Sequence, residues 1–269
     1  MACYFNDVKN AVIFLNDKIK FDNLGTCLRL LIINSNKFYV FPCDFKIYCP
    51  LNPIVVYYSK INTETEVSQT FQELYREIPQ KLWNHILSYK YNRERQLRLA
   101  GKLLLLQMMR YFDLAGLTLN DLQFSGENKP SFPGSDFNFS LAHSENISIC
   151  AGTMNANIGI DIEYIKPVNT ALVKDCLNAG ELKLPEENAV SYSSFYKIWT
   201  KKEAVLKAAS RGLDETLLQT INTLEEPVAF GNEKYCTRYI DVDEKYIACI
   251  ASDKTVNAPV LIKKMTTLE

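Results

Sequence analysis

Residues 195–213 carry the helical periodicity that most constrains how this chain can fold. Apolar side chains recur there at spacings of three and four residues, at Phe195, Ile198, Trp199, Val205, Leu206 and Ala209. This pattern indicates a helix with one buried face, and Gly212 stands where such a helix is expected to stop. Lys202 falls near the middle of the apolar arc, so it is either a lysine that reaches past the core into solvent or a functional cation. Glu203 and Lys207, one turn apart, suit a solvated surface pair equally well.

An acidic motif lies upstream, where residues 158–163 alternate strictly between apolar and polar positions. The three isoleucines share one face of the predicted strand, and Gly159, Asp161 and Glu163 share the other. Carboxylates about 6.5–7 Å apart on one face repel each other, and a divalent cation relieves that repulsion. Oxygen ligands with few other donors favour Mg²⁺. The alternative is the solvated face of an amphipathic strand.

Composition and charge bound the class of protein. The 269 residues allow one large domain or two of ordinary size, and 47% apolar residues can build a full core. A formal charge of −1 gives no footprint for nucleic acid. The eight cysteines include no C-x-x-C pair, which favours free thiols in a reducing compartment. No apolar run is long enough to span a membrane and no secretory signal is visible, so we expect a cytoplasmic protein.

We predict an α+β fold with three segments. Residues 1–52 are an extension of unknown role with short apolar runs that suit hairpins, residues 53–130 form an N-terminal half, and residues 131–269 form a C-terminal half with the acidic motif. Helices are expected at 71–78, 80–87, 92–113 and 170–179, besides the one at 195–213. Strands are expected at 54–58, 137–141, 147–152, 158–163, 217–224, 229–230, 235–240 and 246–251.

Basic residues crowd the first half of the predicted helix 92–113, at Arg93, Arg95, Arg98 and Lys102. Like charges at this spacing repel, so these side chains either face water or meet an anion. His143 stands at the end of a predicted strand. One histidine in such a place is either structural or part of a site.

Three motifs follow one another in a fixed order: Asn138-Phe-Ser-Leu-Ala-His143, then Gly159-Ile-Asp-Ile-Glu163, then Trp199-Thr-Lys-Lys-Glu-Ala-Val-Leu-Lys207. This set resembles the 4'-phosphopantetheinyl transferases of the surfactin-activating (Sfp) type, which carry G-I/V-D-x-E and W-x-x-K-E-x-x-x-K motifs. Their G-K-P loop corresponds here to residues 126–130, with two extra residues. The chain departs from many members at Ala142, where they have a serine.

The resemblance implies a function and a fold. Members transfer the 4'-phosphopantetheine group of coenzyme A to a serine of an apo acyl or peptidyl carrier protein, with Mg²⁺, and release adenosine 3',5'-bisphosphate. They fold as two similar α+β halves related by a pseudo-twofold axis, with the active site in the cleft between them. We therefore expect a monomeric enzyme whose partners are coenzyme A and a carrier protein. Two alternatives stay open: a non-catalytic module that binds coenzyme A or a carrier protein, and a Mg²⁺-dependent phosphohydrolase.

The resemblance also implies residue roles. Asp161, Glu163 and Glu203 correspond to the metal ligands. Glu203 and Lys207 correspond to catalytic residues, with Glu203 as the acceptor of the serine proton. The residues implied to contact coenzyme A are Lys202 and Lys207 at the pyrophosphate, His143 at a phosphate, and Lys129 and Arg93 at the nucleotide end. On this interpretation Lys202 points into a cleft.

Overall fold

The computed structural model describes residues 30–34, 37–41, 53–61, 78–124, 129–183, 192–254 and 260–265. The chain forms two compact units, Met1–Cys49 and Pro50–Glu269. In the first unit, β1 (Leu30–Asn34) and β2 (Lys37–Phe41) pair as an antiparallel hairpin, as two of the apolar runs predicted. Most of the helix predicted at 71–78 lies outside the described residues.

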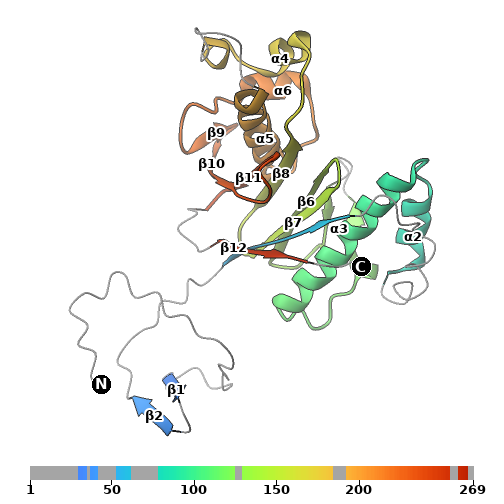
Figure 1. Ribbon diagram of the computed structural model, residues 1–269, viewed down its shortest axis with the longest axis vertical. Helices are drawn as coiled ribbons and strands as arrows, with labels where there is room; N and C mark the ends of the chain where they lie inside the picture. Colours follow the sequence, from blue (N-terminus) through green and yellow to red (C-terminus); the bar gives the residue numbers. More distant parts are fainter. Residues whose placement is uncertain are drawn as a thin grey trace. The chain divides into compact units, whose positions relative to one another are not determined.

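The first sheet of the unit Pro50–Glu269 has the strand order β12-β3-β7-β6 (Figure 1). Its strands are β3 (Ile54–Lys60), β6 (Phe137–Ser144), β7 (Ile147–Met154) and β12 (Val260–Lys264). β12 runs parallel to β3, and the other pairs are antiparallel. The long helix α3 (Asn92–Tyr111) packs against this sheet, next to α2 (Gln80–Leu87). A short ladder of β4 (Gln123–Phe124) and β5 (Pro130–Ser131) precedes β6, after a 3-10 turn at Leu119–Asp121.

The second sheet has the order β8-β11-β10-β9. Its strands are β8 (Ile158–Tyr164), β9 (Val228–Phe230), β10 (Glu233–Ile240) and β11 (Tyr246–Ser252), all antiparallel. α5 (Tyr192–Ala208) packs against β8 and β11. The shorter helices are α4 (Thr170–Cys176) and α6 (Glu215–Thr220), with a 3-10 turn at Glu181–Lys183 between α4 and α5.

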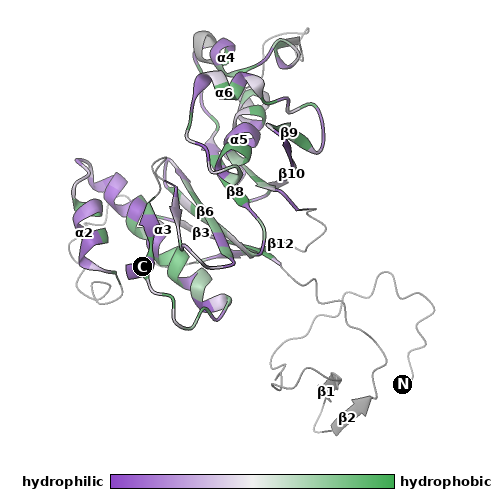
Figure 2. Cartoon of the chain, turned by 180° about the vertical axis from the view of Figure 1, so that it is seen from behind, coloured by the Kyte–Doolittle hydropathy of each residue, from purple (hydrophilic) through white to green (hydrophobic). Residues whose placement is uncertain are grey.

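Three apolar clusters hold these layers together. Ile158, Ile160 and Ile162 are fully buried in a cluster that also contains residues of β3, β7 and β11, so this face of β8 looks into the space between the sheets. A second cluster fills the contact of α2 and α3 with the first sheet, and a third lies under α5. Figure 2 shows the matching polarity: the first half of α3 is mostly hydrophilic and its second half mostly hydrophobic. The burial of the three isoleucines on one face of β8 confirms the strict alternation predicted for residues 158–163.

The two sheets meet along β6 and β8, which lie side by side without forming a backbone ladder in the described residues. Two serine hydroxyls of β6 join them instead. The Oγ of Ser140 accepts a hydrogen bond from the Ile160 N–H at 3.1 Å, and the Oγ of Ser144 accepts one from the Tyr164 N–H at 3.0 Å. This seam sets the acidic face of β8 next to the end of β6.

The α+β class and most predicted elements are confirmed, but the strand predicted at 217–224 is wrong. The structure forms the helix α6 there. The Asp214 carboxylate caps this helix by accepting hydrogen bonds from the N–H groups of Thr216 and Leu217. Leu218 is its buried residue, and Ile221, the C-cap three positions further on, is buried as well. A single turn with two apolar anchors is too short for its periodicity to separate helix from strand.

The end of α5 also differs from the prediction. The helix ends at Ala208, before the expected stop at Gly212. Ser210 takes the left-handed conformation, with φ at 56°, and the Arg211 N–H donates to the Leu206 carbonyl at 2.9 Å. The residue that ends a helix in the left-handed conformation is usually a glycine, but here it is a serine.

The boundary predicted after residue 130 does not separate the two sheets, because β6, β7 and β12 from its far side share a sheet with β3. The division of Pro50–Glu269 into two similar halves stays a prediction. Cys150, Cys176, Cys236 and Cys249 are free thiols. Among the described residues, no helix has the length and apolarity needed to cross a membrane.

Candidate active site

A glycine lets α5 lie directly on β8. A Cβ atom built on Gly159 would lie 1.9 Å from the Ala204 carbonyl oxygen and 2.5 Å from the Ala208 nitrogen, both backbone atoms of α5. Only glycine accommodates this approach, because other side chains would force the helix away from the strand. The close contact brings Glu203 and Lys207 of α5 to the acidic face of β8.

Three carboxylates and one ammonium group converge at this contact. The Lys207 Nζ lies 2.7 Å from the Asp161 Oδ1 and 3.7 Å from the Glu203 Oε2. Glu163, two residues along β8 from Asp161, accepts a 2.7 Å hydrogen bond from the Ser144 Oγ and another from the Trp199 side chain. Asp161 is 5% exposed, and its Oδ2 is buried with no hydrogen-bond partner among the described residues. A buried carboxylate oxygen of this kind has the capacity to bind a further cationic group.

The pKa values of the acids reflect their burial and mutual repulsion. Burial raises the pKa of Asp161, and burial and the neighbouring charge of Asp161 raise the pKa of Glu163. The same two causes raise the pKa of Glu203 to about 7. Burial disfavours the ammonium of Lys207, but the charges of Asp161 and Glu203 outweigh it and raise its pKa. The site therefore holds more negative charge than one ammonium group balances.

The donor set fits a divalent cation in its chemistry. It offers oxygens from Asp161, Glu163 and Glu203, and one of these oxygens is buried and unpartnered. Over the described ranges, however, no three histidine, cysteine or acidic side chains already have the arrangement of a metal centre. Lys207 supplies the countercharge between Asp161 and Glu203 in this structure.

A cluster of positive charges lies between α3 and the end of β6. Arg98 packs over the Tyr89 ring, with 4.4 Å from its Cζ to the ring centroid, and its Nε is buried with no hydrogen-bond partner in the described ranges. Partial desolvation and the charges of Arg98, Lys207 and Arg93 lower the pKa of His143 to about 4. Burial and Arg98 lower the pKa of Lys102 to about 8. Within the described part of the chain Arg98 has no acidic partner, which makes this group of cations suited to binding an anion.

Arg98 was only one of four crowded basic residues in the sequence, and the structure singles it out. Arg93, which the resemblance assigned to the nucleotide end, pairs with Glu145 in the turn between β6 and β7. Its Nε donates to the Glu145 carbonyl at 2.8 Å, and its guanidinium pairs with the Glu145 carboxylate. Lys166 pairs with the same carboxylate at 3.0 Å.

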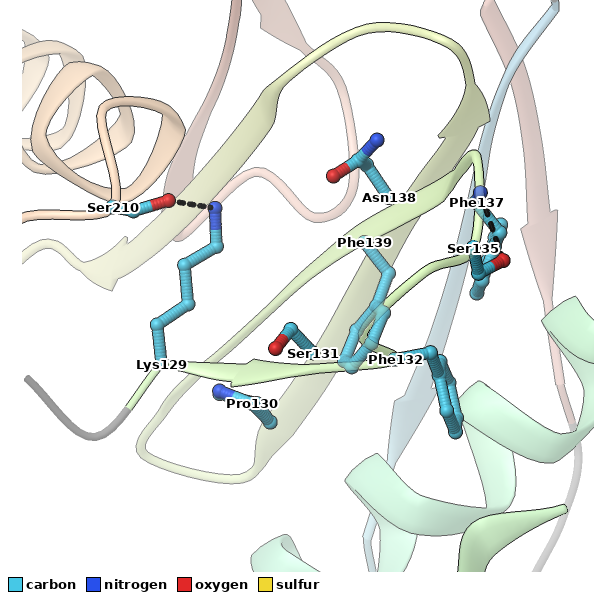
Figure 3. Close-up of a pocket in the computed structure, with 9 residues that line it drawn as sticks. All are labelled: Lys129, Pro130, Ser131, Phe132, Ser135, Phe137, Asn138, Phe139 and Ser210. Carbon is cyan, nitrogen blue, oxygen red and sulfur yellow. Dashed lines mark hydrogen bonds between the residues drawn. The ribbon is translucent and has the colours of Figure 1, made fainter. Parts of the chain in front are cut away.

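Lys129 closes the C-terminal end of α5. Its Nζ donates to the Lys207 carbonyl at 2.6 Å and to the Ser210 Oγ at 3.2 Å. Figure 3 shows this side chain extending from the strand at Pro130 towards Ser210, at the rim of a cavity of 150 Å³. A second cavity of 220 Å³ adjoins it, and its lining includes Lys129, Leu141, Glu203 and Lys207. The carboxylate cluster thus opens onto a space that could receive part of a ligand.

The prediction that Lys202 points into a cleft is wrong. Its Nζ lies 2.6 Å from the Glu181 Oε2, and both side chains are fully buried. The ammonium also donates to the carbonyls of Cys176 at 2.9 Å and Leu218 at 2.7 Å. Its position in the apolar arc of α5 directs it into the core, where Glu181 supplies the countercharge that the helix pattern alone could not reveal.

Ala142, the departure from the family motif, contributes its methyl group to the cluster between the sheets and is 7% exposed. It therefore faces away from the cationic cluster. Its neighbour His143 is exposed on the other side of β6.

Comparisons with known proteins narrow the chemistry that this cluster of carboxylates and a lysine can carry. Residues 157–251 match the family model of the 4'-phosphopantetheinyl transferase superfamily. The matched segment contains Asp161, Glu163, Glu203 and Lys207. The resemblance predicted from the motifs is confirmed for this part of the chain.

Several curated proteins are similar to the chain over part of its length. The 4'-phosphopantetheinyl transferase HetI of Nostoc sp. is 36% identical over 88 residues, which are 30% of this chain and 36% of that protein. A 4'-phosphopantetheinyl transferase of Bacillus subtilis is 28% identical over 145 residues, covering 50% and 62%. The 4'-phosphopantetheinyl transferase Sfp of Bacillus subtilis strain 168 is 32% identical over 102 residues, covering 36% and 45%. The chain thus spans less than two thirds of the length of these relatives.

Proposed function

We propose that the protein is a 4'-phosphopantetheinyl transferase: it moves the phosphopantetheine arm of coenzyme A to a serine of an apo carrier protein and releases adenosine 3',5'-bisphosphate. The convergence of Asp161, Glu203 and Lys207, within the segment that matches the superfamily, carries this proposal. The reaction breaks the bond between the β-phosphorus and the bridging oxygen of the pyrophosphate. It forms a bond from the serine oxygen to that phosphorus.

Asp161, Glu163 and Glu203 are the residues that would hold Mg²⁺. The excess negative charge of the cluster and the unpartnered Oδ2 of Asp161 support this assignment. When bound, Mg²⁺ would neutralise charge that builds up on the pyrophosphate oxygens.

We assign the remaining roles to side chains around the cluster. Lys207 presents an ammonium that can stabilise the leaving phosphate. Glu203, the acid that α5 brings to the cluster, is assigned to accept the proton of the serine hydroxyl. Arg98 and His143 offer donors to a phosphate of coenzyme A. Lys202 takes no part in contacting the substrate, because its ammonium is enclosed in the core.

Mass spectrometry of carrier proteins tests the proposal. The full chain is incubated with coenzyme A, Mg²⁺ and purified apo carriers of fatty acid, polyketide and peptide synthesis. We expect one or more carriers to gain the mass of the phosphopantetheine group, and chelation of the metal to stop the gain. Coenzyme A binding without a mass gain on any carrier would instead support a non-catalytic binding module.

Arg98→Ala should weaken coenzyme A binding and raise the pKa of both histidines. The loss of a charge-assisted contact to phosphate is expected to raise KM for coenzyme A about 10-fold. Because the charge of Arg98 lowers the pKa of His143 and of His85, its removal favours both imidazolium forms. NMR titration is simple to assign because the chain has only two histidines. Unchanged pKa values would contradict the proximity of Arg98 to these rings.

Arg110→Ala, in the last turn of the same helix, is the matched control. Arg110 is not among the described charges that lower the pKa of His85 or His143. The substitution should leave KM and both pKa values close to those of the wild type.

A further inference from the structure

We infer that the buried ion pair of Lys202 and Glu181 is a positioning device: it fixes the rotation of α5 about its own axis and so holds Glu203 and Lys207 against Asp161. The expected effect on kcat rests on the proposed function. Lys202 and Glu181 would act without contacting the substrate.

The ammonium of Lys202 has a complete set of acceptors. Its three N–H donors meet the Glu181 carboxylate, the Cys176 carbonyl and the Leu218 carbonyl, at distances between 2.6 and 2.9 Å. The two carbonyls belong to the last turns of α4 and α6. One side chain of α5 is therefore held by three separate segments, which leaves the helix no freedom to turn without breaking these bonds.

Glu181 is fixed just as firmly. Its Oε1 accepts hydrogen bonds from the Thr223 N–H at 2.9 Å and the Thr223 Oγ1 at 2.7 Å, and its Oε2 accepts one from the Asn178 N–H at 3.0 Å. Asn178 in turn donates to the Ile221 carbonyl. The carboxylate is thus preorganised by the backbone, and the charge of Lys202 meets it in a defined place.

The geometry of a helix links this network to the site. Consecutive residues are about 100° apart around the axis, so Lys202 points into the core while Glu203 points towards β8. Turning α5 by about 20° would move a carboxylate that lies about 6 Å from the axis by about 2 Å. A displacement of about 1 Å at a reacting centre can cost about 10²-fold in rate. The positions of Glu203 and Lys207 relative to Asp161 therefore depend strongly on the rotation of α5.

Stability alone does not explain such a pair. Replacing a buried ion pair with neutral groups of similar size is often neutral or stabilising, so the fold could be held by apolar residues at these positions. What an ion pair adds is direction, because a charged donor with three fixed acceptors has one low-energy arrangement. Gly159 sets how closely α5 approaches β8, and the ion pair sets which of its side chains face the strand.

The test uses the full chain with the double substitution Lys202→Met and Glu181→Gln, which removes both charges and keeps side chains of similar size. We expect kcat for carrier modification to fall about 10-fold or more, with KM for coenzyme A changed less than about twofold. The single substitution Lys202→Met leaves Glu181 with its hydrogen bonds from Thr223 and Asn178 and should also lower kcat. It also serves if the double variant does not fold. Equal kcat in the wild type and both variants would overturn the inference.

A second readout does not depend on transfer. The chain has two tryptophans, and Trp199 bonds Glu163 at the carboxylate cluster while Trp83 is buried under α3. After labelling with 5-fluorotryptophan, Mn²⁺ should broaden the ¹⁹F signal of Trp199 in the wild type and leave that of Trp83 sharp. The double variant should need about 10-fold more Mn²⁺ for the same broadening. Identical titrations would contradict the inference even if no carrier were modified, so this outcome is separate from failure of the proposed function.

Val228→Ala is the matched control. Val228 lies fully buried on β9, in the apolar cluster under α5, and takes part in none of the hydrogen bonds of the ion pair. It should lower the free energy of unfolding while leaving kcat and the Mn²⁺ titration unchanged. A fall in kcat equal to that of the double variant would show that any weakening of this core disturbs the site, and would overturn the specific role of the pair.

Discussion

Asp161→Asn should abolish carrier modification, by about 10³-fold or more, and leave the fold intact. Asparagine keeps the shape of the side chain and can still accept the Lys207 hydrogen bond through its Oδ1. It cannot supply the negative charge that the cluster needs to hold a cation. Because burial raises the pKa of Asp161, the folded protein carries this charge at a cost. We therefore expect the free energy of unfolding to change by less than about 1 kcal/mol.

Rates measured by mass spectrometry and unfolding measured in urea check the two halves of this prediction. Asp241→Asn, at an exposed position after β10, is the control and should behave as the wild type in both assays. If the Asp161→Asn variant modified the carrier at the wild-type rate, Asp161 would not be a metal ligand. Loss of transfer together with a collapse of stability would show that Asp161 is structural.

Gly159→Ala should be among the most destabilising single substitutions in the second sheet, lowering the free energy of unfolding by about 4 kcal/mol or more. The added methyl group would meet backbone atoms of α5 at 1.9 Å and 2.5 Å, and backbone cannot rotate aside as a flexible side chain can. The only relief is movement of α5 away from β8. That movement would also carry Glu203 and Lys207 away from Asp161, so activity should fall in any molecules that fold.

Gly212→Ala is the matched control, since a Cβ at Gly212 would meet no atom of the described residues within 4 Å. It should change the free energy of unfolding by less than about 1 kcal/mol. Urea denaturation of both variants gives the comparison directly. Equal midpoints for Gly159→Ala and the wild type would mean that α5 does not pack on β8 as closely as described.

The sequence was sufficient to predict the elements with strong periodicity. The alternation at residues 158–163 correctly placed Ile160 on one face of β8 and Asp161 on the other, and the helical spacing from Phe195 gave α5 its buried face. It could not distinguish α6 from a strand, since one turn with two apolar residues suits both periods. The end of α5 was missed because Ser210 adopts a conformation that favours glycine.

The candidate site divides in the same way. Motif order grouped Asp161, Glu203 and Lys207, and the structure brings these three together. Helix geometry already placed Lys202 in the apolar arc, but its partner Glu181 lies in another segment that no periodicity connects to α5. A residue assigned to substrate by motif alone can thus belong to the core. Pairings between distant segments are the part of a site that single-sequence patterns leave undetermined.

The join between β6 and β8 has a consequence for how the protein loses its activity. Ser144 stands on one strand and supports Glu163 on the other, and in the described residues only side-chain hydroxyls, rather than a backbone ladder, link the pair. Opening along this line breaks few hydrogen bonds, and what resists it is the apolar cluster between the sheets, which denaturants weaken. Inactivation by mild denaturant would then precede global unfolding, with both halves of the divided site still folded.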